Sequence, residues 1–207
     1  MWFDLSQLPP RDGYKLLSST IVPRPIAWVV SADADGRLNA APFSFFNLFC
    51  DDPPVICLGV MGRAGQPKDT AANIRARGEF VVNLVPERLA HQMNTTACEY
   101  EHGVDELEVA GLATAPCRTI AVPRIAESPV ALECIPMQYI ELGNGRMLIA
   151  ARVRSVYVDD EAVIDQDRCY VDTPALGLVA RMHGRGEYAR TSNLFTMPRP
   201  PTPPESS

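Results

Sequence analysis

Two long β-strands joined by a tight turn constrain the fold of this chain more than any other sequence feature. Segments 130–142 and 146–158 both carry a strand pattern, and Gly143, Asn144 and Gly145 separate them. Asn and Gly both tolerate positive φ angles, so an Asn-Gly pair between two such segments is a strong signal for a β-hairpin. The sequence therefore predicts a long antiparallel hairpin in its C-terminal half.

Further strands and short helices precede this hairpin. Pro67 suits the first position of a helix and Gly78 suits its end, which predicts a helix over 67–77. A second helix is predicted over 86–97, with Leu89, Met93 and Ala97 on one face. Several strands with few helices favour a mainly β, antiparallel barrel over a doubly wound sheet. The remaining strands are predicted at 26–31, at 38–46 with Pro42 marking a bulge or an edge, at 55–61 and at 80–85.

Composition excludes several classes of protein. The 207 residues include 19 basic and 25 acidic side chains, a net charge of −6, and no basic run suited to nucleic acid. We expect no secretory signal, since residues 1–5 lack its pattern, and no membrane partner, since no apolar run approaches about 20 residues. Six scattered cysteines suggest reduced thiols in a cytoplasmic protein, and three histidines without ligand spacing suggest no metal site. We expect one domain over 1–197 and a Pro-rich, extended or disordered tail over 198–207.

The predicted helix start near residue 68 is the first candidate site. A helix start offers unpaired N–H groups and the positive end of the helix dipole, which suit a phosphate. Lys68 adds a charge and Thr70 a hydroxyl donor, whereas the carboxylate of Asp69 would repel a phosphate unless it caps the helix or faces away. An ordinary solvated helix start is the alternative.

Segments 39–47 and 181–190 are the other two candidates. Alternation along a strand places Ser44 on one side and Phe43 and Phe45 on the other, which suits a flat ring with a polar tail, or simply a core strand. The second segment combines glycines with His183 and Tyr188, and His183 could donate a proton near neutral pH. A solvated basic loop is the alternative there.

Taken in order, these segments resemble the flavin reductase-like family of FMN-binding split barrels, which includes flavoredoxin-type proteins. The matching segments are Val22–Val29, Asn39–Pro54, Lys68 to Thr70 with the preceding Pro67, and the closing HGRGEYAR run. The resemblance implies a six-stranded split barrel, usually a homodimer, with FMN held near the subunit interface. It implies a catalytic role near the flavin for His183, and FMN contacts from Trp28, Asn39, Pro42, Phe43, Ser44, Phe45, Asn47, Lys68, Asp69 and Thr70.

The function implied by this resemblance is electron transfer through FMN. NADH or NADPH would reduce the flavin directly, and electrons would pass to a second flavin, a partner monooxygenase or another acceptor. Three alternatives remain open: an FMN electron carrier that ignores nicotinamides, an FMN enzyme with its own small organic substrate, and a barrel that has lost its cofactor.

Overall fold

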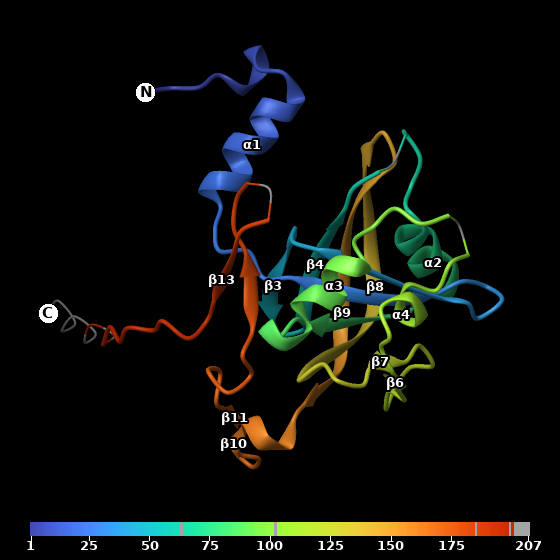
Figure 1. Ribbon diagram of the computed structural model, residues 1–207, viewed down its shortest axis with the longest axis vertical. Helices are drawn as coiled ribbons and strands as arrows, with labels where there is room; N and C mark the ends of the chain where they lie inside the picture. Colours follow the sequence, from blue (N-terminus) through green and yellow to red (C-terminus); the bar gives the residue numbers. More distant parts are fainter. Residues whose placement is uncertain (63, 102, 185, 199, 201–207) are drawn as a thin grey trace, which may run out of the picture.

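The computed structural model describes residues 1–62, 64–101, 103–184, 186–198 and 200. Within this part of the chain one antiparallel sheet of seven strands, in the order β2-β1-β5-β8-β9-β4-β3, forms the body of the molecule (Figure 1). Its strands are β1 (Ala27–Ala32), β2 (Leu38–Phe43), β3 (Phe46–Asp51), β4 (Pro54–Val60), β5 (Phe80–Leu84), β8 (Val130–Gly143) and β9 (Arg146–Val158).

Short helices and three small hairpins surround this sheet. The α-helices are α1 (Pro10–Thr20), α2 (Asp69–Arg77), α3 (Ala90–Thr95) and α4 (Glu106–Val109), and the 3-10 helices are η1 (Leu5–Gln7), η2 (Glu87–Leu89) and η3 (Asp160–Ala162). The hairpins pair β6 (Thr114–Ala115) with β7 (Arg124–Ile125), β10 (Val163–Asp165) with β11 (Tyr170–Val171), and β12 (Val179–Arg181) with β13 (Tyr188–Arg190).

The predicted hairpin is confirmed almost residue for residue. Strands β8 and β9 pair up to Gly143 and Arg146, so Asn144 and Gly145 form the turn. Their φ angles are +52° and +70°, the positive values that the residue types indicate. The strands at 26–31, 55–61 and 80–85 and the helix at 67–77 are also present within a residue or two, although the helix begins at Asp69.

The predicted strand at 38–46 is wrong in one respect, because the chain bends at Ser44 and Phe45. β2 ends at Phe43 and pairs with β1, whereas β3 begins at Phe46 and pairs with β4. These two strands form opposite edges of the sheet, so the bend joins the edges and closes the sheet into a barrel. The N–H of Gly59 in β4 donates to the carbonyl of Phe45, 2.7 Å away. The main sheet therefore has seven strands instead of the expected six, and Pro42 lies in an edge strand as expected.

Strand β1 is buried on both faces and separates two apolar clusters. Val29 packs in a cluster with Ile74 of α2, while Trp28 packs on the other face in a cluster with Met93 of α3 and Leu107 of α4. The predicted helix over 86–97 is divided between η2 and α3; Leu89 and Met93 are buried, but Ala97 is exposed.

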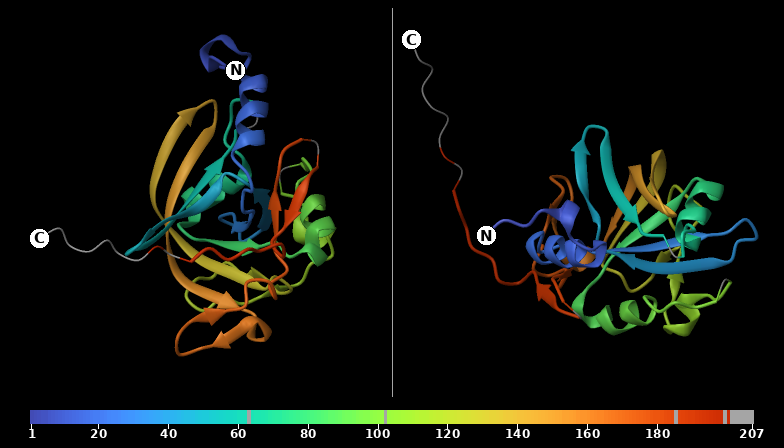
Figure 2. Two further views of the ribbon diagram at one scale, coloured as in Figure 1. Left: turned by 90° about the vertical axis from the view of Figure 1, so that its left-hand side faces the viewer. Right: turned by 90° about the horizontal axis from the view of Figure 1, so that it is seen from above.

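Helix α1, which the sequence analysis did not predict, stands away from the barrel. Figure 2 shows it projecting beyond the body of the molecule, close to the β12–β13 hairpin only at its C-terminal end. The expected Pro-rich tail over 198–207 falls almost wholly outside the described residues. All six cysteines are free thiols.

Candidate functional site

Three adjoining hollows follow residues 39–47 along the barrel edge. The first, the helix-start hollow, has a volume of about 280 Å³ and lies between the start of α2 and the segment after α3. The second, the middle hollow, has about 220 Å³ and shares Pro42 and Ala97 with the first. The third, the aromatic hollow, has about 480 Å³, shares Ser44 with the second, and includes Phe45, Phe46 and Phe49 in its lining. Because neighbouring hollows share lining residues, the three are together called the groove; its lining is mixed polar and apolar at the helix-start hollow and mostly apolar at the aromatic hollow.

The helix-start hollow brings together most of the predicted phosphate residues. Lys68 precedes α2 with extended backbone angles and makes no side-chain capping bond, and its carbonyl accepts from the N–H groups of Ala71 and Ala72. Within the described residues the ammonium group of Lys68 has neither an ion-pair nor a hydrogen-bond partner. Lys68, Asp69 and Thr70 all line the hollow. A positive helix end and an available ammonium group therefore meet there.

Thr70 is engaged in a polar network beneath the hollow. Its side chain is 1% exposed, and its hydroxyl donates to the Oδ1 atom of Asn39 over 2.8 Å. The side-chain amide of Asn39 in turn donates to Glu106, over 2.7 Å, and the backbone N–H of Ala40 donates to the same carboxylate, over 2.9 Å. Asn39 and Thr70 thus fix the floor of the hollow, and the hydroxyl proton of Thr70 points to Asn39.

Glu106 was missed by the sequence analysis. It lies in the short helix α4, in a middle segment without a distinctive motif, and only its fold contacts bring it to β2. Burial raises the pKa of Glu106, and the hydrogen bonds from Ala40 and Asn39 offset this only in part. A buried carboxylate that accepts two bonds from β2 holds that strand at a fixed distance from α4.

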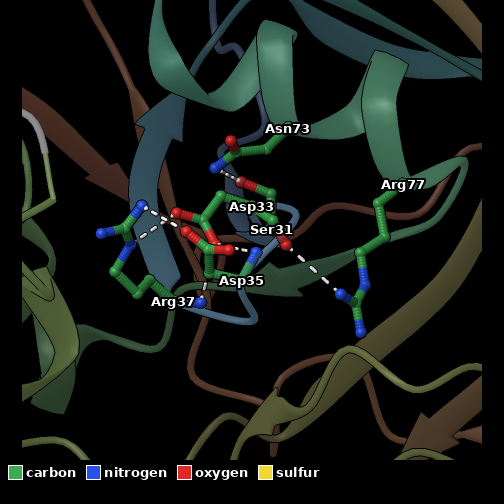
Figure 3. A network of polar contacts seen from close by, with 6 residues as sticks. All are labelled: Ser31, Asp33, Asp35, Arg37, Asn73 and Arg77. Atoms are coloured by element: carbon green, nitrogen blue, oxygen red, sulfur yellow. Dashed lines mark hydrogen bonds and ion pairs between the residues drawn. The ribbon is translucent and has the colours of Figure 1, made fainter.

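A second polar network holds α2 against the β1–β2 turn (Figure 3). Asn73 donates to the hydroxyl of Ser31 over 3.3 Å, and Arg77 donates to the carbonyl of Asp33 over 3.2 Å. Asp33 also pairs with Arg37, with 2.7 Å between Oδ2 and Nε. Asn73 and Arg77, one helical turn apart on one face of α2, are thus joined to the end of β1 and to the turn after it, which fixes the direction of the helix.

The middle hollow receives its polar wall from the β12–β13 hairpin. Arg181 and Tyr188 line it, and the guanidinium carbon of Arg181 lies 4.8 Å from the centre of the Tyr188 ring. His183, the predicted catalytic residue, lies beyond this wall at the end of the hairpin. It is half exposed, and its Nε2 atom lies 3.2 Å from a carboxylate oxygen of Glu187. It does not line any of the three hollows.

Of the predicted flavin contacts, only Trp28 lies away from the groove. Its indole is fully buried in the core, and its Nε1–H donates to the hydroxyl of Thr96 over 2.9 Å. Thr96 lines the helix-start hollow, so Trp28 supports the groove from behind. The remaining predicted contacts border the groove: Asn39, Pro42, Phe43, Ser44, Phe45 and Asn47.

The donor set of the groove fits FMN. One end offers a helix start and an ammonium group for a phosphate, and the centre offers hydroxyl and amide groups that suit a polyhydroxyl chain. The other end offers an apolar space of about 480 Å³ beside aromatic rings, which suits a flat ring system. Among the described residues, no three His, Cys, Asp or Glu side chains are grouped to hold a metal ion.

Comparison with known proteins agrees with this arrangement. Residues 18–174 match the family described as "Flavin reductase like domain". The chain belongs to this family. Two solved structures of similar proteins each have a TM-score of 0.89. Nitrilotriacetate monooxygenase component B from Bacillus cereus is 31% identical, with 95% of this chain and 98% of that chain covered. The 2-nitrobenzoate 2-nitroreductase NbaA from Pseudomonas fluorescens is 32% identical, with both chains covered fully.

A third structure supports the fold assignment. A putative flavin reductase with a split barrel domain from Shewanella frigidimarina has a TM-score of 0.82 and 24% identity, covering 96% of this chain and 99% of that chain. The mainly β, antiparallel split barrel expected from the sequence is thus confirmed. Among the described residues no helix has the length and apolar character needed to cross a membrane.

Proposed function

We propose that this member of the flavin reductase-like family binds FMN in the groove and transfers electrons through it. The phosphate would be held by Lys68 and the start of α2, with Asn39 and Thr70 beneath it. The ring would lie beside Ser44 and Phe45, where the groove becomes apolar. Bound FMN would supply the redox chemistry, and the chain would supply position, charge and exclusion of water.

One observation carries this proposal: along residues 39–47 the groove changes from a polar end, where Lys68 and the start of α2 lie beside the carboxylates of Asp69, Glu99 and Glu106, to an apolar, aromatic end. Residues 39–43 are extended, so the two ends are separated by several steps of about 3.3 Å each. A small inorganic anion would need only the first hollow, and a small apolar compound only the third. A ligand with an anionic tail and a flat ring uses the whole groove.

NADH or NADPH is the proposed electron donor, and a second flavin or a partner monooxygenase the proposed acceptor. The 31% identical neighbour, by its name, is a component of a monooxygenase, which supports a partner of that class. The free thiols support a cytoplasmic location. We also propose that two copies of the chain associate and that residues 1–197 form the single domain.

Titration of the purified protein with FMN tests the proposal directly. We expect a bound, yellow complex whose flavin absorbance bleaches in stopped-flow mixing with NADH or NADPH. Bleaching by dithionite but by neither nicotinamide would indicate an electron carrier. Protein that remains colourless after incubation with FMN would refute the proposal.

A second candidate function is reduction of a small organic substrate of its own. The 32% identical neighbour is named a nitroreductase, and the aromatic hollow is larger than the other two hollows. Nitroaromatic carboxylates are the compounds to test first. Nicotinamide oxidation that depends on such a compound, without added free flavin, would favour this candidate over flavin reduction.

A further inference from the structure

Arg24 is a buried cation at the side of the aromatic hollow. It lies between α1 and β1, is 7% exposed, and lines the hollow together with Ser44. Buried arginines are ordinarily paired with a carboxylate or a phosphate, because an isolated charge in a medium of low dielectric constant is costly. The partners of Arg24 therefore indicate what its charge is for.

All hydrogen-bond partners of the Arg24 guanidinium group are uncharged oxygens. Nη1 donates to the carbonyls of Ser18, over 2.6 Å, and Ile21, over 2.8 Å. Nη2 donates to the carbonyl of Met182 over 2.7 Å, and Nε lies 3.4 Å from the hydroxyl of Ser44. No carboxylate of a described residue lies within ion-pairing distance of the guanidinium group.

Helix α1 balances this charge only in part. The carbonyls that Nη1 contacts belong to the last turn of α1 and the residue after it, where the helix dipole is negative. The dipole end is equivalent to roughly half an elementary charge, and the effect falls off within one turn. A net positive charge therefore remains at the wall of the hollow.

We propose that Arg24 supplies the countercharge for the reduced flavin ring beside Ser44, so that the site binds reduced FMN more tightly than oxidised FMN. This inference rests on the proposed function. Two electrons and one proton added to the neutral ring leave it with one negative charge at pH 8. The apolar lining alone would disfavour that anion, whereas a fixed cation at the wall of the hollow stabilises it.

A purely structural role for Arg24 makes a different prediction. The side chain joins the end of α1, the β12–β13 hairpin through Met182, and the bend at Ser44. If holding these segments were its only role, its loss would weaken the binding of both redox forms of FMN equally. The ratio of the two dissociation constants separates the two roles.

The experiment compares the wild-type protein with Arg24→Gln and with Arg124→Gln as a matched control. Like Arg24, Arg124 donates only to uncharged oxygens, in its case the carbonyls of Ile125 and Ala126, but it stacks on Tyr157 and lines none of the three hollows. Dissociation constants for FMN are measured at pH 8 in air and, anaerobically, after dithionite reduction.

We expect Arg24→Gln to lower the preference for reduced FMN by tenfold or more. For a two-electron couple this lowers the midpoint potential of bound FMN by about 30 mV. Arg124→Gln and the charge-preserving Arg24→Lys should keep the wild-type ratio within a factor of three. Equal weakening of both forms by Arg24→Gln would overturn the proposal and leave Arg24 a structural clamp.

The wild-type protein provides a test that survives if Arg24→Gln does not fold. The wild-type chain should bind reduced FMN at least tenfold more tightly than oxidised FMN at pH 8, and a ratio of one or less would overturn the proposal. Failure to bind either form would refute the proposed function itself, and the Arg24 proposal with it. The two failures are therefore distinguishable.

Discussion

At the scale of single residues, Lys68 offers the sharpest test of the phosphate site. The chain has one other lysine, Lys15, which can serve as a control of the same residue type. We expect Lys68→Ala to weaken FMN binding by about 10- to 100-fold, since a charge-assisted bond contributes about 1.5–3 kcal/mol. Riboflavin lacks the phosphate, so its affinity should not change. Lys15→Ala is the control, because Lys15 lies on α1 and pairs with Asp12. Equal loss for FMN and riboflavin would place the phosphate elsewhere.

His183 is tested by a matched pair of substitutions on one hairpin. The ring of Tyr188 lines the middle hollow, whereas His183 lies outside it beside Glu187. A catalytic His183 predicts that His183→Ala binds FMN normally but alters turnover with NADH or NADPH. Tyr188→Ala should instead weaken FMN binding, because it opens the hollow. Normal turnover of His183→Ala in a steady-state assay would make the histidine structural.

Glu133 is expected to make stability depend on pH. It is 3% exposed in β8, and its carboxylate accepts bonds from the N–H of Arg118 and from the N–H and hydroxyl of Thr119. Burial alone would raise the pKa of Glu133, but these bonds together lower it below its usual value. A lowered folded-state pKa stabilises the fold above the unfolded-state pKa, and this stabilisation is lost as the pH falls through the folded-state pKa.

Urea unfolding of Glu133→Gln measures this contribution. We expect it to reduce the free energy of unfolding by about 2–4 kcal/mol at pH 7, because an amide group would face backbone donors. The difference from wild type should narrow steadily below about pH 4, as the wild-type carboxylate becomes protonated. Glu141→Gln, on the exposed part of the same strand, should change stability by less than about 1 kcal/mol. A difference in unfolding free energy between wild type and Glu133→Gln that stays constant with pH would contradict the stabilising role of the ionised Glu133.

At the scale of elements, the β8–β9 turn supports the loop that leads to Lys68. A Cβ atom at Gly145 would lie 2.2 Å from the carbonyl carbon of Gln66 and 2.7 Å from the nitrogen of Pro67. Gly145→Ala should therefore displace this loop and weaken FMN binding. Gly143→Ala is the matched control, because its φ is also positive but nothing lies within 4 Å of a Cβ there. Both variants should lose stability. A titration in which both bind FMN equally would contradict the claim that the β8–β9 turn supports the loop before Lys68.

The elements that the sequence predicted well are those with local signals. Turn chemistry specifies the hairpin at Asn144 and Gly145, and a helix stop in the left-handed conformation specifies the end of α2 at Gly78. The bend at Ser44 and Phe45 has neither Gly nor Pro at those two positions, so it has no local signal. It is imposed instead by barrel closure and by the hydrogen bond from the N–H of Gly59. Helix α1 was missed although Pro10 stands at its first position, a helix-start signal, and its apolar residues recur at helical spacing.

The candidate site follows the same rule. Lys68 and the aromatic segment could be predicted because each lies within one motif of the chain. Arg24 and Glu106 depend on contacts between segments far apart in sequence: Arg24 bonds to Met182, and Glu106 bonds to β2. Trp28 illustrates the reverse error. An aromatic residue in a flavin-binding motif suggested ring contact, but β1 is buried on both faces, so its side chain supports the groove from the core.

At the scale of the whole molecule, the exposed side of the barrel near α1 predicts a dimer. Helix α1 projects from the body (Figure 2), and isolated helices shorter than about 12 residues are marginal in water. Several large apolar side chains are exposed on this side: Tyr14, Leu17 and Ile21 on or just after α1, and Leu48 and Phe49 on β3. Both α1 and β3 border the aromatic hollow. Apolar patches of this kind mark interaction surfaces, and a second copy of the chain would cover this one.

Sedimentation equilibrium tests this dimer against a matched substitution. Wild-type protein should have twice the 22.7 kDa mass of one chain, and Leu48→Glu should raise the dimer dissociation constant, since a charge in an apolar interface must be desolvated. Ile164→Glu is the control. Ile164 is 68% exposed, against 63% for Leu48, and belongs to β10, a strand that lies away from α1 (Figure 1). The interface would lie beside the aromatic hollow, which Leu17 of α1 helps to line. Loss of the dimer through Leu48→Glu should therefore also weaken FMN binding, whereas Ile164→Glu should not. A wild-type chain that sediments as a monomer at high concentration would mean that α1 and its apolar residues remain exposed to water, and that each groove binds its ligand without a second copy.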